Sequence, residues 1–85
     1  MSVATAGRRL TLVSRADCEL CDHFLDALNQ LQAQAALPPI ARLDVDGDPV
    51  LQRRWGLKVP VLLLDGALVC WGRLDSAELL RILQL

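Results

Sequence analysis

The sequence of 85 residues has few aromatic side chains: it contains no tyrosine, one phenylalanine and two tryptophans, although 53% of its residues are hydrophobic. Its core must therefore be built mainly from leucine, valine and alanine. A chain of this length forms one domain, in which only about 60% of the surface of the unfolded chain can be buried. We therefore expect no second domain.

The sequence also has no large excess of charge of one sign. The formal net charge is -1, and the longest basic runs are the pairs Arg8-Arg9 and Arg53-Arg54. Nucleic acids and anionic lipids need larger clusters of lysine and arginine. No segment approaches the roughly 20 apolar residues that span a bilayer, and residues 1–7 contain no apolar stretch of signal-peptide length. We expect a cytoplasmic protein, monomeric by default, with no nucleic-acid or membrane partner.

Cysteine is scarce too, and the three that occur are Cys18, Cys21 and Cys70. An odd number in a chain without an export signal argues against a framework of structural disulfides. Such residues are thiols, metal ligands or redox catalysts. The spacing of Cys18 and Cys21, with two residues between them, makes this pair the main candidate for chemistry.

Hydrophobic periodicity predicts an order of strand, helix, strand, short helix, two strands and a final helix. Strands are expected over residues 9–14, 40–45, 59–64 and 67–71, and helices over 18–35, 48–56 and from 75 to the C-terminal end. The first strand, helix and strand form a parallel crossover, whereas the last two strands form an antiparallel hairpin. This order predicts an α/β domain over residues 9–85, after a flexible tail over residues 1–8.

The helix boundaries have local signals. Asp48 is a good N-cap ahead of Pro49 at the first helical position, and Gly56 stands where a glycine would end a helix of about two turns. Asp75 and Glu78 have the spacing of a capping box at the start of the last helix.

Two motifs carry a resemblance to a known family. The motif S-R-x-x-C-x-L-C after a strand is matched by Ser14, Arg15, Cys18, Leu20 and Cys21. It resembles the glutaredoxin-like family of small bacterial proteins. Residues 55–62 (WGLKVPVL) are similar to the segment that in thioredoxins leads into a cis-proline before the central strand. The resemblance implies a thioredoxin-like, glutaredoxin-sized fold, with a four-stranded mixed sheet, helices on both faces and thiol-disulfide oxidoreductase activity.

The chemistry of the cysteine pair follows from its place at the start of a helix. There, unpaired backbone N–H groups and the helix dipole favour an anion, so Cys18 is expected to be the nucleophile. Cys21, one turn further and on the apolar face, is expected to resolve the mixed disulfide. Asp17 and Glu19 oppose a thiolate at Cys18, whereas Arg15 favours it, so the size of the shift in the pKa of Cys18 stays open.

The resemblance also implies a substrate site. Glutaredoxins hold glutathione with the residue before the cis-proline, basic side chains and a glycine-rich turn that opens the last helix. The matching residues here are Val59, Pro60, Lys58, Arg73 and Asp75. Trp71-Gly72 replaces the glycine pair, so we expect weak, salt-sensitive glutathione binding. The implied partners are a protein or small-molecule disulfide and a reductant such as glutathione or a thioredoxin reductase system, with no tightly bound cofactor.

The residues allow two other interpretations. A zinc site would need His23 and Cys70 beside the cysteine pair, but on a helix His23 points about 200° around the axis from Cys21. His23 is then a solvated residue, Cys70 a small buried hydrophobe, and Trp55 and Trp71 packing residues. The other alternative keeps the fold and discards the chemistry: an interaction module whose cysteines are incidental.

Overall fold

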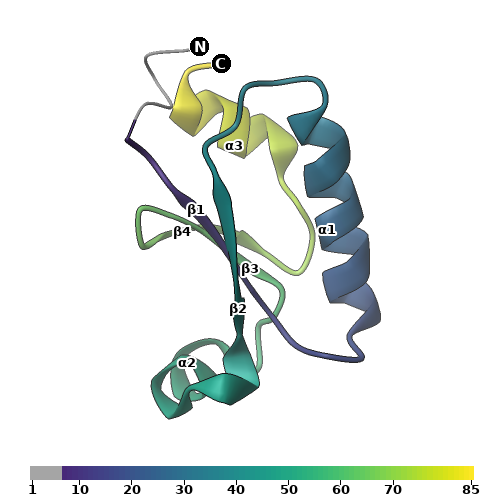
Figure 1. Cartoon of the computed structure of the whole chain (residues 1–85), viewed down its shortest axis with the longest axis vertical. Helices are drawn as coiled ribbons and strands as arrows, with labels where there is room; N and C mark the ends of the chain where they lie inside the picture. Colours follow the sequence, from purple (N-terminus) through teal and green to yellow (C-terminus); the bar gives the residue numbers. More distant parts are fainter. Residues whose placement is uncertain (1–6) are drawn as a thin grey trace.

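A computed structural model describes residues 7–85. It contains four strands, β1 (Leu10–Ser14), β2 (Ile40–Asp44), β3 (Val61–Leu64) and β4 (Ala67–Trp71), and three helices, α1 (Glu19–Gln32), α2 (Pro49–Trp55) and α3 (Ser76–Leu83) (Figure 1). The elements follow the predicted order. Of the expected tail over residues 1–8, residues 1–6 lie outside the described residues, and Arg8 makes an ion pair with Asp65 at 2.9 Å.

The strands form one mixed sheet in the order β2-β1-β3-β4. Strands β1 and β2 are parallel, and the pairs β1–β3 and β3–β4 are antiparallel. The predicted crossover and hairpin are therefore confirmed, and with them the thioredoxin-like fold. All four residues of β3 are buried, as expected of a central strand. Strand β3 begins at Val61 rather than at residue 59, since Pro60 has no N–H to give to the ladder.

Helices cover both faces of the sheet. The larger core cluster lies between the sheet and helices α1 and α3, and consists of Leu10, Leu12, Phe24, Leu28, Leu62, Leu64, Leu79 and Leu83. The smaller cluster lies on the opposite face, under α2 and the 3₁₀ turn Val45–Gly47, and consists of Val13, Val45, Trp55, Val61 and Leu63. Leucine and valine supply most of both clusters, as the shortage of aromatic residues requires.

Helix α1 is shorter than predicted. Its buried residues Cys21, Phe24 and Leu28 recur at helical spacing, but the helix ends at Gln32 rather than at residue 35. The following residues form turns, because the chain must become extended before the prolines at positions 38 and 39 to enter β2. None of the helices in the described part of the chain is long and apolar enough to cross a membrane.

The caps and the hairpin turn form largely as the sequence predicts. The Asp48 carboxylate accepts the Val50 N–H at 2.8 Å, and the Asp75 carboxylate accepts the Glu78 N–H at 3.0 Å. Glu78 does not complete the capping box, because its carboxylate pairs with Arg81. The turn between β3 and β4 has positive φ angles of 52° and 86° at residues 65 and 66, as a tight hairpin requires.

Candidate active site

Three segments that are far apart in the sequence meet where β1 and β4 end and β3 begins. Val61, the first residue of β3, pairs with Val13 near the end of β1 and with Trp71 at the end of β4. The loop before Cys18, the Val59-Pro60 segment and the turn after β4 therefore lie together at one end of the strands. Their meeting at this end of the sheet positions the candidate site.

The cysteine pair lies where β1 leads into α1. Cys18 and Cys21 are joined by a disulfide, with their Cα atoms 5.2 Å apart. Cys18 has an extended backbone and is the N-cap of α1, and its Sγ accepts the Cys21 N–H at 3.1 Å. Cys18 is partly exposed, whereas Cys21 is only 3% exposed. One cysteine is thus partly exposed at a helix N-terminus, and the other is buried.

The loop before Cys18 is fixed by Arg15. Its Nε and Nη2 atoms donate to the Asp46 carboxylate at 2.8 and 3.0 Å, and its Nη1 donates to the Gly56 carbonyl at 3.1 Å. The hydrogen bond from Arg15 lowers the pKa of Asp46, although burial partly opposes this. The sequence indicated Arg15 only as a charge that favours a thiolate. In the structure it also ties the cysteine loop to the 3₁₀ turn and to the end of α2.

Gly56 is the C-cap of α2, as predicted, but it does not end the helix with a left-handed backbone. Its φ of -56° is an ordinary helical value rather than the left-handed value of a helix-ending glycine. Glycine is required here by space, because a Cβ atom at this position would overlap the Gln52 carbonyl oxygen. The Gly56 carbonyl also accepts the hydrogen bond from Arg15 Nη1.

The Val59–Pro60 bond is cis, as the resemblance to thioredoxins implied. Pro60 is buried, and its carbonyl accepts the Gly72 N–H at 2.8 Å. Gly72 has a φ of 80°, a left-handed value that side chains disfavour. The turn after β4 is therefore joined directly to the cis-proline segment.

The prediction that both tryptophans are packing residues is right for Trp55 and wrong for Trp71. Trp55 is 8% exposed and lies in the core cluster under α2. Trp71 is 52% exposed because it ends β4, which has no outer neighbour in the sheet. The Lys58 ammonium lies 5.1 Å from the centre of its ring, within the range of a cation–π interaction.

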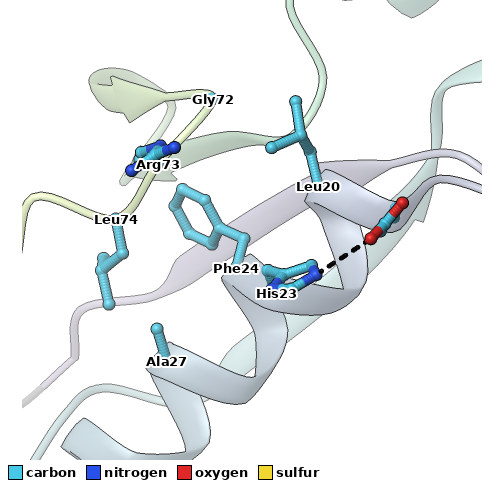
Figure 2. A pocket seen from close by; sticks show the side chains of 8 residues that line it. Leu20, His23, Phe24, Ala27, Gly72, Arg73 and Leu74 are labelled. Carbon is cyan, nitrogen blue, oxygen red and sulfur yellow. Dashed lines mark ion pairs between the residues drawn. The ribbon is translucent and has the colours of Figure 1, made fainter.

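Arg73 and Leu20 line a cavity on the other side of this turn. The cavity lies between α1 and residues 72–74 (Figure 2). Leu20, in the first turn of α1, is 51% exposed because the cavity leaves its side of the helix uncovered. Sequence reasoning therefore missed Leu20 as a candidate contact residue, although it stands between the two cysteines. Asp75, predicted as a binding residue, has its carboxylate engaged as the N-cap of α3.

Neither His23 nor Cys70 joins the cysteine pair. His23 is exposed and lies 3.5 Å from the Glu19 carboxylate, one turn away on α1. Cys70 is half-buried on β4, opposite Leu62, and burial raises the pKa of its thiol. Within residues 7–85, no three side chains of His, Cys, Asp or Glu come together in a group that could hold a metal ion.

Comparison with known proteins agrees with this architecture. Residues 9–84 match the model of the glutaredoxin-like domain (DUF836). The chain belongs to this family. Among the curated proteins, none matches the chain.

The glutaredoxin-like domain is also similar to solved structures. Protein Ne2328 from Nitrosomonas europaea has a TM-score of 0.75 and 28% identity over 85% of this chain and 86% of that one. Protein XcR50 from X. campestris has a TM-score of 0.63 and 32% identity over 88% and 95% of the two chains. The holo form of glutaredoxin C1 from Populus tremula x tremuloides shares the fold, with a TM-score of 0.53 and 20% identity over 88% and 82%.

Proposed function

We propose that this glutaredoxin-like domain is a thiol-disulfide oxidoreductase, with Cys18 as the nucleophile and Cys21 as the resolving thiol. The observation that supports this best is the disulfide at the start of α1, which joins a partly exposed sulfur to a buried one. When the pair is reduced, the Cys21 N–H that points at Cys18 Sγ stabilises a thiolate there, and so does the helix dipole.

The reaction takes place in two exchanges. The Cys18 thiolate attacks one sulfur of a substrate disulfide, so that a Cys18–substrate disulfide forms and the other substrate sulfur leaves as a thiolate. Cys21 then attacks Cys18 Sγ and closes the Cys18–Cys21 bond; the Cys18–substrate bond breaks, and the Cys21 proton ends on the released substrate sulfur. Two electrons pass to the substrate, and the protein ends in the oxidised form, with the Cys18–Cys21 disulfide.

The substrate binds at the end of the sheet where the cysteine loop and the cis-proline segment meet. The Val59 backbone, beside Pro60, offers hydrogen bonds to the extended chain of a substrate. Lys58 and Arg73 supply positive charge, and Asp75 caps α3 and so positions the turn that carries Arg73.

Glutathione or a thioredoxin reductase system recycles the oxidised pair in a reducing compartment such as the cytoplasm. We expect glutathione itself to bind weakly. Lys58 lies over Trp71, whereas Arg73 lines the cavity beside α1, so the two cations approach the site from different sides. Isothermal titration at two ionic strengths should show weak binding that falls with salt, whereas tight binding at both would contradict this.

A redox titration of the purified domain, with metal analysis of the same sample, tests the proposed function. We expect a reversible two-electron couple that is lost in Cys18→Ser and Cys21→Ser and kept in Cys70→Ser. Cys21→Ser should also accumulate a mixed disulfide at Cys18. Thiols no more reactive than those of a free peptide would instead favour an interaction module, and bound zinc would favour a metal site.

A further inference from the structure

A cavity of about 520 Å³ adjoins the cysteine pair. It lies between the first two turns of α1 and the loop that joins β4 to α3, and its volume is in the range of small-ligand sites. Glu19 and Leu20, the two residues between the cysteines, form one end of it. Because Glu19 directly follows Cys18 in the chain, the cavity is placed to receive a group of the molecule whose disulfide Cys18 attacks.

The floor of the cavity is apolar. Phe24, Ala27 and Leu74 point into the space between α1 and the loop, and Leu20 forms the end next to the cysteines (Figure 2). Leu20 is 51% exposed and Leu74 is only half-buried, so both still have apolar surface in contact with water. An apolar side chain placed here would remove this surface from water, which favours its binding.

Two side chains of opposite charge, Glu19 and Arg73, line the cavity. The Glu19 carboxylate at its rim has a partner in His23, 3.5 Å away. Arg73 lies above Phe24, and within residues 7–85 its guanidinium takes part in none of the ion pairs. The Arg73 guanidinium can therefore pair with a carboxylate on the bound group.

We propose that this cavity binds the residue that follows the substrate cysteine. It selects peptides in which that residue is C-terminal, so that it has both an apolar side chain and a carboxylate. The proposal rests on the oxidoreductase function proposed above. Glutathione fits it poorly, since the residue after its cysteine is glycine, which leaves the apolar floor uncovered. Preferred substrates are then disulfides of peptides that end in cysteine followed by a leucine-like residue with a free carboxylate.

Four symmetrical disulfides of N-acetyl dipeptides test this selection: Cys-Leu and Cys-Gly, each with a free carboxylate or an amide. Protein reduced with dithiothreitol and then separated from it is mixed with each disulfide, and the released thiols are measured in a single turnover. No other reductant is needed, because closing the Cys18–Cys21 bond supplies the two electrons. We expect the Cys-Leu acid to react about tenfold faster than the Cys-Gly acid. The Cys-Leu acid should exceed its amide by about two- to fivefold.

Two pairs of variants separate the two halves of the selection. Arg73→Gln should remove the preference for the carboxylate and keep that for leucine, whereas Arg42→Gln, with the same change of charge on the edge strand β2, should change neither. Ala27→Glu, which fills and charges the cavity, should remove both preferences. The matched control Asn29→Glu, on an exposed position of α1, should keep them.

The outcomes distinguish the selection from the function on which it rests. Equal rates for all four disulfides, or preferences that survive Ala27→Glu, would overturn the assignment of the cavity and leave the oxidoreductase function standing. If no disulfide is reduced and the redox titration shows no couple, both proposals fail. Rates that follow the order Cys-Leu acid, Cys-Leu amide and Cys-Gly amide, with both variant pairs behaving as expected, support the selection.

Discussion

Cys18 and Cys70 are both partly exposed, yet the structure places their sulfur atoms in different surroundings. Cys18 caps α1, accepts a backbone N–H and has a second cysteine one turn away. Cys70 lies within β4 and packs beside the larger core cluster, where burial raises the pKa of its thiol. Exposure therefore does not distinguish the two cysteines, whereas the backbone that surrounds each sulfur does.

The effect of a helix N-terminus on the pKa of a thiol has a typical size. A helix N-terminus stabilises an anion by up to about 2 kcal/mol, and about 1.4 kcal/mol corresponds to one unit of pKa. Burial acts in the opposite direction on a thiol, because it penalises the charged form. We therefore expect more thiolate at Cys18 than at Cys70. In the proposed mechanism Cys21 resolves the mixed disulfide at Cys18, whereas Cys70 forms no disulfide.

The sharpest test of this comparison replaces each cysteine in turn. Cys18→Ser should reduce the rate of peptide-disulfide reduction on the order of a thousandfold, since it removes the attacking atom. Cys70→Ser should leave the rate within about twofold, because Cys70 takes no part in the proposed exchange. The measurement is thiol release by the pre-reduced protein. A large loss of rate in Cys70→Ser would show that β4 takes part in the chemistry.

A second test disturbs the support of Cys18 and leaves Cys70 alone. Gly56→Ala would force a methyl group against the Gln52 carbonyl and displace the backbone that receives Arg15. We expect a loss of about 1 to 3 kcal/mol in the free energy of unfolding, measured with urea. The alkylation rate of Cys18 in the reduced protein should change, and that of Cys70 should not.

Gly47→Ala is the matched control for Gly56→Ala. A Cβ atom at Gly47 would meet only the Asp44 Cβ, at an ordinary 3.9 Å. We expect a change within about 0.5 kcal/mol, as is usual for substitutions without a specific clash. Equal losses of stability in the two variants would show that glycine is required at Gly56 for a reason other than space.

The local parts of this comparison could be predicted from the sequence. Hydrophobic periodicity and the signals at Asp48 and Asp75 act over a few residues, and they give the order of the elements and most of their ends. The cysteine spacing places a thiol at the start of a helix for the same reason. Burial of Cys21 follows from its position on the apolar face of α1.

Contacts between distant segments could not be predicted in this way. Arg15 reaches Asp46 and Gly56, which are 31 and 41 residues away, and no local pattern selects these partners. The exposure of Leu20 and Trp71 depends on what lies beside them after folding: a cavity in one case and the open edge of β4 in the other. Periodicity shows which face of an element is apolar, but not whether that face is covered along its whole length.

A smaller effect concerns the pH dependence of the two thiols. Two variants each keep one cysteine: Cys21→Ser/Cys70→Ser retains Cys18, and Cys18→Ser/Cys21→Ser retains Cys70. At pH 7 we expect Cys18 to react with iodoacetamide about tenfold faster than Cys70, because thiolate is the reacting form. The rate for Cys70 should rise only at higher pH than that for a cysteine in a short peptide, as its raised pKa requires. Urea should remove this difference; superimposed pH profiles in the folded protein would contradict the comparison.

The smallest effect is electrostatic and lies in the link between Arg15 and Asp46. The pKa of Asp46 is lower in the folded protein than in the unfolded chain, chiefly through its hydrogen bond with Arg15. The resulting stabilisation is present above the unfolded pKa, about 3.9, and is lost as the pH falls through the folded value. The difference in melting temperature between the wild type and Asp46→Asn should therefore be present at pH 6 and shrink below about pH 4.

Asp65→Asn is the matched control for this last test. Its pKa is also lowered, chiefly by a hydrogen bond from Arg8, but it lies in the hairpin turn rather than beside the cysteine loop. Both variants should therefore lose stability with the same dependence on pH. Only Asp46→Asn should also change the alkylation rate of Cys18, because only Asp46 holds the arginine that precedes α1. A change in both variants would mean that the rate follows overall stability; a change in neither would mean that Arg15 does not position Cys18.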